Sequence, residues 1–536
     1  MLSGEVISEG SGSVEFDADV LVLGGGPAGT WAACTAAERG ARVILADKGF
    51  CGSSGATAPS GTGVWYIEAD AEKREAAMAS REVLGGYLQD RLWMHRVLDR
   101  TFDSINLLAA RGYPFPIDAN GHSRRNSLQG PEYMRLMRRQ TQEASVLILD
   151  HSPALELLVD DTGAVAGATG LRRQRGDNWV VRAKSVIMAT GGCAFLSKAL
   201  GCNLLTGDGY LMAAEAGADL SGMEFSNAYA ISASFSSVTK TLFYKWASFT
   251  YENGEIIPGA GSQGGRSAIA RALMVGPVYA QLDQVEPGMQ ATLRLAQPNF
   301  FLPFDRVGIN PFTQRFPITL LLEGTVRGTG GLRITDETCA TSVAGLFAAG
   351  DAATRELICG GFTGGGSHNA AWAMSSGYWA GAAAADHAKQ LGTTTKRQVF
   401  RAGGVALRSR TKASFNPNET TKAVQDEVFP FKRNYFRTAD QLVPSLDRLN
   451  KLWQTINHAD AADRDQVLRA RECAAMIATA RWMYRSALAR QESRGMHRRE
   501  EFPHQDHKQH HYITTGGLDD VWTGTRPVLA HALQDA

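Results

Sequence analysis

The sequence predicts an α/β fold that is interrupted by an inserted α+β segment and followed by a helical region. Residues 17–50 have the pattern of a strand, a glycine-rich turn, a helix and a second strand. Residues 146–190 form short β-rich runs separated by the polar turns DTG and RGDN. A βαβ unit followed by antiparallel strands indicates an α/β sheet that carries a side sheet.

Changes in sequence character place the domain boundaries. From Phe225 to about Leu322 the chain is aromatic-rich and irregular, and then GTGGLRIT and VAGLFAAGDAA return to short strands and turns. An inserted domain whose two ends rejoin the first domain explains this order. We expect a first domain made of 15–225 and 326–392, an inserted domain at 226–325, a helical domain at 400–512 and a tail at 513–536.

The expected helical domain follows a change in composition. The stretch TTTKRQ at 393–398 is expected to be a linker. Beyond it, PSLDRLNKLWQTINHA and DRDQVLRARECAAMIATARWMYRSALARQ have apolar residues at helical spacing.

Composition excludes several classes of function. Lys+Arg 55 against Asp+Glu 54 gives a formal net charge of +1, so the chain has no overall basic field to hold nucleic acid. The longest apolar runs fall short of the ~20 residues that span a bilayer, and Met1–Asp17 is acidic without an apolar h-region. We therefore expect a cytoplasmic protein without a transmembrane segment. The 7 Cys include no CxxC pair, which disfavours an iron–sulfur cluster within this chain.

The motif GGGPAG at 24–29 predicts a dinucleotide site. Gly24 permits the tight turn, Gly26 lets a pyrophosphate approach the backbone, and Gly29 allows close packing of helix and strand. The helix that begins near Ala28 directs its N-terminal amides toward the phosphates. Asp47 ends the second strand at the offset where a carboxylate accepts from a ribose hydroxyl, which argues against a 2′-phosphate.

A second copy of this glycine spacing lacks the structural context. Gly259, Gly261 and Gly264 follow the polar turn YENGEIIP, and no strand ending in an acid comes after them. We therefore interpret only the first copy as a nucleotide site. Without a second unit for NAD(P)H, the cofactor is expected to be a tightly held FAD whose electrons are exchanged through something other than a bound nicotinamide.

Several motifs occur together and in one order along residues 17–512. They are GGGPAG at 24, SSGAT at 53, ATGG at 189, TGDGYLMAAEAGADLSGMEF at 206, GRSAIARAL at 265, GTGGL at 328, GLFAAGD at 345 and RSALARQESRGMHRREEFP at 485. In this the chain resembles the succinate dehydrogenase and fumarate reductase flavoprotein family, which includes L-aspartate oxidase and the adenylylsulfate reductase α subunit. The resemblance implies a Rossmann-like FAD-binding domain, interrupted by a mobile α+β capping domain and followed by a C-terminal helical domain.

The resemblance and the glycine motif together give a set of expected cofactor-binding residues. The SSGAT loop would wrap the flavin, Thr190 and Gly191 would lie near the adenosine and pyrophosphate, and Asp208 and Asp351 would hold the ribityl and phosphate region. The full set is Gly24, Gly26, Pro27, Ala28, Gly29, Asp47, Lys48, Ser53, Ser54, Gly55, Ala56, Thr57, Ala154, Thr190, Gly191, Asp208, Gly350, Asp351 and Ser367. Family members with a covalent flavin carry His in the loop where Gly55 stands here, so the FAD is expected to be noncovalent.

The substrate-clamping residues of the dicarboxylate enzymes are absent. Tyr229 and Ala230 stand in place of His-Pro, Val326 in place of His, and Thr363 in place of Arg. Succinate and fumarate are therefore disfavoured as substrates.

The expected catalytic residues are Arg271, Arg266, Tyr229 and His368. In GRSAIARAL, the resemblance aligns Arg271 with the family's proton-carrying arginine, and Arg266 lies five residues earlier. An arginine transfers a proton only in a closed site with an assisting neighbour, and the alternative is a surface or salt-bridging arginine. His368, in GGGSH, serves the flavin or the substrate, or else caps a helix.

Two further groups of side chains are interpreted as structural. The His-rich loop with His504, His507, His510 and His511 is expected to be solvated, so no metal site is predicted. The aromatic residues of the inserted domain more often form a core than a ligand cage. They are Phe235, Phe243, Tyr244, Trp246, Phe249 and Tyr251.

These observations predict a FAD-dependent oxidoreductase that exchanges a hydride between flavin and a small molecule held between the FAD and capping domains. The first hypothesis is reduction or dehydrogenation at a carbon–carbon bond, with Arg271 as the proton carrier. The second is sulfur-centred chemistry like that of adenylylsulfate reductase, and the third is an electron-transfer subunit of a larger iron–sulfur complex. An iron–sulfur or ferredoxin-type protein is the expected redox partner.

Overall fold

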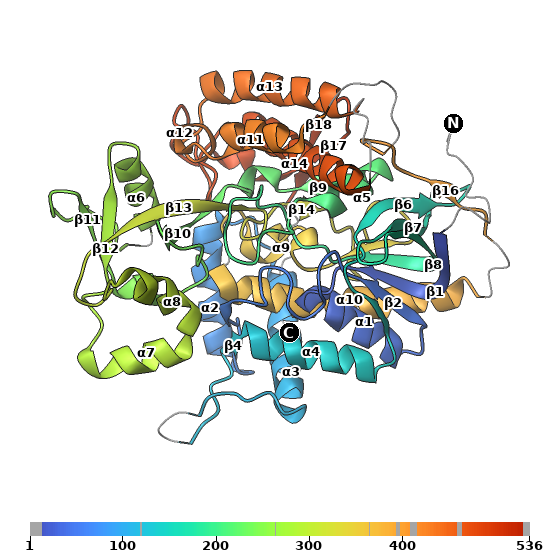
Figure 1. Ribbon diagram of the computed structural model, residues 1–536, viewed down its shortest axis with the longest axis horizontal. Helices are drawn as coiled ribbons and strands as arrows, with labels where there is room; N and C mark the ends of the chain where they lie inside the picture. The colour runs from blue at the N-terminus through green and yellow to red at the C-terminus, as the bar shows by residue number, and fades with distance from the viewer. Residues whose placement is uncertain are drawn as a thin grey trace.

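The computed structural model describes residues 13–528, apart from 118–120, 263, 364, 393–396, 408–414 and 458–463. Figure 1 shows an α/β domain at the centre and right, the inserted domain at the left and a mainly helical domain above them. Most of the linker expected at 393–398 lies outside the described residues.

The α/β domain is built on one eight-stranded sheet. Its strands, in spatial order, are β16 (Phe400–Arg401), β6 (Ala154–Val159), β7 (Val165–Arg172), β8 (Asp177–Met188), β1 (Ser13–Leu23), β2 (Val43–Ala46) and β5 (Leu147–Leu149), with β15 (Leu346–Ala348) also paired to β8. β1, β2, β5, β8 and β15 run parallel, while β6 and β7 extend the sheet antiparallel. Because β15 follows the insertion, the chain leaves this sheet and returns to it.

Helices cover the sheet and bring the glycine-rich turn to its carboxyl edge. α1 (Pro27–Glu38) lies against α10 (Gly365–Gln390), as Figure 1 shows. The contact is close because a Cβ on Gly377 or Gly381 would lie 2.4 Å from a carbonyl oxygen of α1. The remaining helices of this domain are α2 (Ala71–Gly85), α3 (Arg91–Ala110), α4 (Gly130–Glu143), α5 (Asp208–Glu215) and α9 (Glu356–Cys359), with η1 (Met223–Phe225), η4 (Gly350–Ala352) and the hairpin β3 (Gly61–Gly63) and β4 (Ser127–Gln129).

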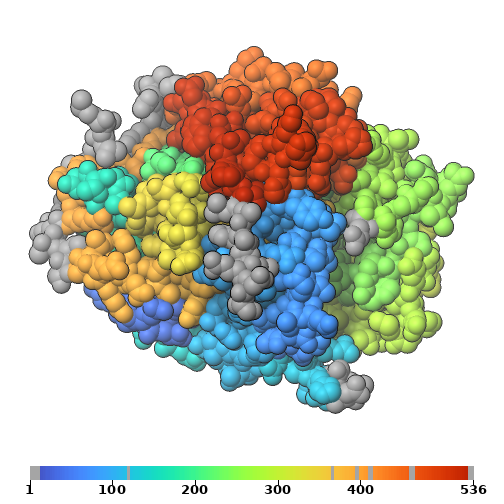
Figure 2. All heavy atoms as spheres, turned by 180° about the vertical axis from the view of Figure 1, so that it is seen from behind, coloured from blue at the N-terminus to red at the C-terminus, as the bar shows by residue number. Residues whose placement is uncertain are grey.

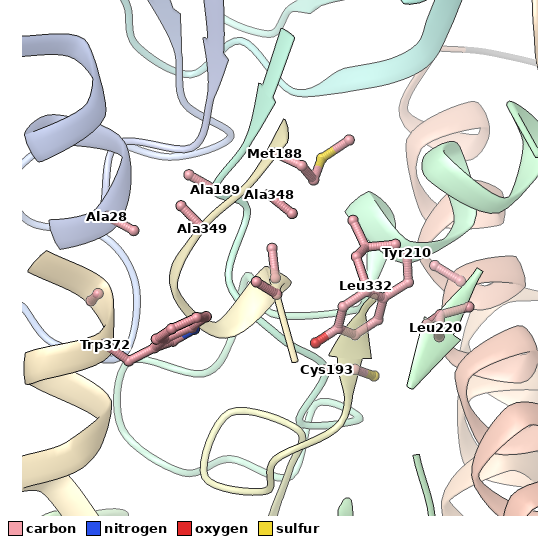
Figure 3. Packing of buried hydrophobic residues seen from close by; sticks show 14 of the residues in the cluster. Ala28, Met188, Ala189, Cys193, Tyr210, Leu220, Leu332, Ala348, Ala349 and Trp372 are labelled. Atoms are coloured by element: carbon pink, nitrogen blue, oxygen red, sulfur yellow. The ribbon is translucent and has the colours of Figure 1, made fainter. Parts of the chain in front are cut away.

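The turn η4, which follows β15, is held from two sides. The Trp372 indole donates to the Gly350 carbonyl at 3.0 Å, and the Tyr210 hydroxyl donates to the Asp351 carbonyl at 2.7 Å. Figure 3 shows both rings pointing toward this turn among buried alanines and Met188. The turn that carries Asp351 is therefore fixed by the core.

The inserted domain, here called the cap, has a four-stranded antiparallel sheet. Its strands are β10 (Ala228–Ala233), β13 (Phe316–Gly324), β12 (Val278–Gln281) and β11 (Ser248–Tyr251), and its helices are α6 (Gly265–Leu273), α7 (Gln290–Ala296) and α8 (Pro298–Val307), with the short turns η2 (Phe243–Trp246) and η3 (Pro287–Met289). Phe243 packs edge-on against Phe300, and Phe304 against Phe316. The cap aromatics therefore form its core, as the sequence predicts.

The C-terminal part contains both helices and strands. Its elements are α11 (Pro417–Val428), α12 (Phe431–Asn434), α13 (Ala439–Asn457), α14 (Arg464–Ala489), η5 (His507–Gln509), β17 (His511–Gly516) and β18 (Trp522–Pro527). β17 and β18 join β9 (Leu220–Ser221) and β14 (Gly331–Leu332) in a second sheet. This corrects the tail expected at 513–536, since β17 pairs with β9 of the α/β domain and β18 pairs with β17.

The C-terminal part also contacts the N-terminal half directly. In Figure 2 it lies in red directly above the light-blue segment that contains α2 and α3. The Tyr512 hydroxyl donates to the Leu88 carbonyl at 2.6 Å, and the guanidinium of Arg494 donates to the Gly86 carbonyl. The domains thus form one packed unit around the carboxyl edge of the sheet.

Candidate active site

The carboxyl edge of the sheet opens into a cavity of about 410 Å³, here called the large cavity. Its walls come from the turn before α1, the end of β2, residues 54–63, the starts of α5 and η4, and the first turns of α10. Residues 240–242 close it from the cap. A cavity of this size, lined mainly by apolar groups with a few polar ones, is typical of a cofactor site.

The glycine-rich turn leaves backbone exposed toward this cavity. Gly24 has φ +108°, and a Cβ there would lie 2.2 Å from the Ala189 carbonyl oxygen. A Cβ on Gly29 would lie 1.8 Å from the Gly24 carbonyl, so helix and strand pack as the motif predicts. Gly26 has no atom within 4 Å of its Cβ position, and this open space is where the motif places a pyrophosphate.

Asp47 holds the turn as well as lining the cavity. Its carboxylate accepts from the Gly25 amide at 2.6 Å and from the Gly49 amide at 2.7 Å. Burial raises the pKa of Asp47, while these two backbone bonds act in the opposite direction. The carboxylate that the sequence assigns to a ribose therefore also fixes the glycine-rich turn.

A buried ion pair lies on another wall of the cavity. Lys48 Nζ lies 2.7 Å from Asp208 Oδ2 and 2.8 Å from Glu472 Oε1 on α14. Burial opposes the charged form of Lys48, yet the two carboxylates keep its pKa above the ordinary value. The C-terminal part thus helps to position two residues of the cofactor wall.

Nearly all the expected cofactor residues meet at this cavity. Those that line it are Gly24, Gly26, Pro27, Ala28, Asp47, Lys48, Ser54, Gly55, Ala56, Thr57, Ala154, Thr190, Gly191, Asp208, Gly350, Asp351 and Ser367. Gly29 packs inside the helix–strand contact instead. Ser53 is exposed and outside the cavity, which corrects its assignment; the loop turns back there, with Ser54 Oγ accepting from the Phe50 amide at 2.6 Å.

The residues present fit FAD. The open space at Gly26 suits a pyrophosphate, and the cavity continues past the Ser54–Thr57 loop to the cap. No histidine or cysteine is found among the described residues that line it. Gly55 has φ +86°, a conformation that side chains rarely adopt.

Two cations that the sequence did not single out line the cavity near the cap. They are Lys240 and Arg327, and both contact the buried carboxylate of Glu323: Lys240 Nζ at 2.6 Å and Arg327 Nε at 3.4 Å. Burial alone would raise the pKa of Glu323, but Lys240 and Arg327 outweigh it and lower the pKa to about 2. This end of the cavity therefore carries one carboxylate and two cations.

A smaller pocket of about 30 Å³, here called the small pocket, lies where all three parts of the chain meet. Arg266 and Ser267 contribute from the cap, Phe362 and Thr363 from the α/β domain, and Tyr435, Met496 and Arg498 from the C-terminal part, together with Asn227, Ala228, Tyr229 and Gly264. Burial and the nearby charge of Arg327 together lower the pKa of Arg266 to about 10, so the two pockets are close neighbours.

The two arginines of α6 differ in their surroundings. Arg271, the expected proton carrier, has 56% of its side chain exposed, pairs with Glu500 at 3.0 Å and stacks on Phe436. Arg266 lines the small pocket. Five residues correspond to about 140° around a helix, so both side chains cannot face one site. In the structure Arg271 is therefore a surface arginine in a salt bridge, which is the alternative to a proton carrier.

The other two expected catalytic residues are held by structural contacts. The Tyr229 hydroxyl donates to the carbonyls of Val428 and Phe429 at 2.9 and 3.0 Å, and burial raises its pKa well above the ordinary value. The His368 ring is buried against Trp65 and does not line the large cavity, because its neighbours Ser367 and Asn369 take that face of α10.

Within the described ranges no cluster of His, Cys, Asp and Glu is arranged to hold a metal ion. His510 Nε2 lies 2.5 Å from the Tyr87 carbonyl, and His511 lies on β17. The seven cysteines are buried and free.

Comparison with known proteins agrees with the motif order. Residues 19–229 match the family described as "FAD binding domain", and residues 425–532 match "Fumarate reductase flavoprotein C-term". The chain belongs to the succinate dehydrogenase and fumarate reductase flavoprotein family. It is therefore a FAD-dependent oxidoreductase of this family.

Relatives in this family match over most or over part of the chain. A fumarate reductase (CoM/CoB) from Methanothermobacter marburgensis has a subunit that is 24% identical over 91% of this chain and 95% of its own length. Urocanate reductase of Eggerthella lenta is 29% identical over 40% of each chain.

Solved structures show the same fold. Quinol fumarate reductase of Escherichia coli superposes with a TM-score of 0.83 at 21% identity, covering 98% of this chain and 99% of that one. Adenylylsulfate reductase of Archaeoglobus fulgidus gives 0.78 at 18% identity, covering 98% of both. In the part of the chain that the structure describes, no helix is both long and apolar enough to cross a membrane.

Proposed function

We propose that this flavoprotein reduces or dehydrogenates a carbon–carbon bond of a small acid other than succinate or fumarate, with Arg266 as the proton carrier. The observation that carries the proposal is the position of Arg266. It is a partly buried cation beside the large cavity, and burial brings its pKa to about 10, while Arg271 faces solvent.

The residues around the site suit proton transfer. When bound in the large cavity, FAD would supply or accept a hydride. In the direction of reduction, Arg266 would donate a proton to the carbon of the substrate's double bond that does not take the hydride. Arg266 then regains a proton from solvent. Tyr435 and Glu323 favour its charged form, so the arginine is protonated again before the next turnover.

The uncharged replacements in the pocket walls support a substrate other than a dicarboxylate. Val326 lines the large cavity and Thr363 the small pocket, at positions where the dicarboxylate enzymes have charged clamps. Two of the relatives are named fumarate reductase and urocanate reductase, after small unsaturated acids, which supports chemistry at a carbon–carbon bond.

An external redox protein is the proposed electron source, in line with an iron–sulfur or ferredoxin-type partner. The second glycine-rich copy supports this, since Gly259 and Gly261 stand in an exposed turn before α6 and not at the end of a buried strand. Neither the parent nor the variants below should oxidise NADH quickly without a partner.

The test compares two arginine variants of the same helix. Arg266→Gln should bind FAD like the parent and be reduced by dithionite at the same rate, yet lose about 100-fold or more in substrate turnover. Arg271→Gln serves as the matched control and should keep its turnover within a few-fold. Full activity in Arg266→Gln, or a 100-fold loss confined to Arg271→Gln, would refute the assignment.

A further inference from the structure

The small pocket contains polar atoms that the protein itself leaves without partners. Arg498 Nε and Asn227 Oδ1 are both buried, and neither has a hydrogen-bond partner within the described residues. Both residues line the pocket, and the Asn227 side chain is fixed there because its Nδ2 donates to the Asn434 carbonyl at 2.9 Å. Buried polar groups without partners cost free energy, so they indicate an occupant.

The charge of the pocket indicates what kind of occupant. Its described lining includes two arginines, Arg266 and Arg498, and no Asp or Glu. The carboxylate that acts on Arg266 is Glu323, which is already shared by Lys240 and Arg327. An anionic group would therefore be attracted into this pocket, and a guanidinium binds an oxyanion through its fork of N–H donors.

The volume of the pocket limits the occupant further. A space of about 30 Å³ holds one small group and not a whole substrate molecule. The remainder of the molecule then lies toward the large cavity, where Arg327 and Val326 stand.

We infer that the small pocket binds a single oxyanion group of the substrate, and that Arg498 determines specificity by binding it opposite Arg266. This inference rests on the proposed function, because it places the acid group of the same substrate. Arg498 is distant in sequence from the cap and from the glycine-rich motifs, and it is held near Tyr435, with its guanidinium 5.7 Å from that ring.

The pocket is complete only when the cap contacts the C-terminal part. Several contacts join them, among them the hydrogen bonds from Tyr229 to the carbonyls of 428 and 429, the contact of Ser267 Oγ with Tyr435 Oη at 3.1 Å, and the pair of Arg271 with Glu500. Arg266 enters from the cap and Arg498 from the other side. Binding of the oxyanion between them should therefore favour the closed cap.

Calorimetric titration of the FAD-loaded protein in chloride-free buffer tests this inference. The probes are acetate, methanesulfonate and the neutral acetamide. Acetate should bind to the parent at least about tenfold more tightly than acetamide, and Arg498→Met should weaken acetate binding between about tenfold and a hundredfold, the range for a lost charged hydrogen bond. Tighter methanesulfonate than acetate would assign the pocket to a sulfur oxyanion, and the reverse to a carboxylate.

Arg485→Met is the matched control, since Arg485 is exposed on α14 in the same part of the chain. It should bind acetate like the parent. Unchanged acetate binding in Arg498→Met would overturn the inference. Equal binding of acetate and acetamide by the parent would also overturn it, and that measurement does not depend on the folding of a variant. An Arg266→Gln enzyme with full turnover would refute the proton carrier while leaving the acetate result intact, so the two failures are distinguishable.

Discussion

Glu323→Gln tests the charge balance at the substrate end of the large cavity. The carboxylate of Glu323 is fully buried and lies 2.6 Å from Lys240 Nζ and 3.4 Å from Arg327 Nε. Its pKa falls from the ordinary 4.5 to about 2, although burial alone would raise it. At about 1.4 kcal/mol per pKa unit, this gap corresponds to roughly 3 kcal/mol of stability at neutral pH.

The sign of the pH dependence follows from the lowered pKa. The stabilisation that the ionised carboxylate of Glu323 provides is fully present above pH 4.5 and is lost as the pH falls through about 2. The variant should therefore be about 3 kcal/mol less stable than the parent at pH 7, and this difference should shrink by about 1 kcal/mol at pH 4. Removing the charge also leaves two partly buried cations without their carboxylate, and loss of one partner of a buried ion pair is strongly destabilising in other proteins.

Urea unfolding followed by tryptophan fluorescence measures these differences. Glu286→Gln, an exposed acid of the cap, is the matched control and should change stability by less than about 0.5 kcal/mol. The double variant Glu323→Gln/Lys240→Met should recover part of the loss, since it removes one of the uncompensated cations. A loss below about 0.5 kcal/mol in Glu323→Gln, or one that does not change between pH 7 and pH 4, would refute this reasoning.

Further predictions concern the cofactor site, Arg266 and Glu356. Gly26→Val should fold but fail to retain FAD on gel filtration, because its side chain would occupy the open space at the pyrophosphate position. Acid denaturation of the parent protein should release all its flavin as free FAD. The rate of double-bond reduction should fall as the pH rises through about 10, where Arg266 loses its proton, and the rate of dehydrogenation should not. Burial raises the pKa of Glu356 to about 7, so the parent protein loses stability when this carboxyl ionises. As the pH rises from 5 to 8, the free energy of unfolding of Glu356→Gln in urea should therefore increase relative to that of the parent by up to about 3 kcal/mol.

The cofactor site could be predicted from the sequence because its parts are local. The turn at Gly24–Gly29, the acid at the end of β2 and the turn at Gly350 each lie at the end of a buried strand, and strand ends of a parallel sheet meet at one edge. The hydrogen bond that the Asp47 carboxylate accepts from the Gly25 amide was not predicted, because it depends on the orientation of the side chain.

The C-terminal strands could not be assigned because their partners are distant in sequence. β17 pairs with Leu220 and Ser221, almost 300 residues earlier, and no nearby segment supplies that pairing. The same holds for Lys240, whose partner Glu323 lies 83 residues later, near the end of β13. Long-range pairing of this kind leaves no periodic signal in the sequence.

The two arginines of α6 show what sequence order alone leaves undecided. Both fall in one motif on one helix, and five residues turn the side chain by about 140°, so the choice depends on which face of α6 meets the rest of the protein. Arg271 meets Glu500 and Phe436 at the rim, where it can hold the cap against the C-terminal part. Arg266 meets the small pocket, where the charge of Arg327 and the loss of solvent lower its pKa. Closure of the cap, in which the exposed Arg271–Glu500 pair is one contact among several, therefore creates the dry surroundings in which Arg266 can give up a proton.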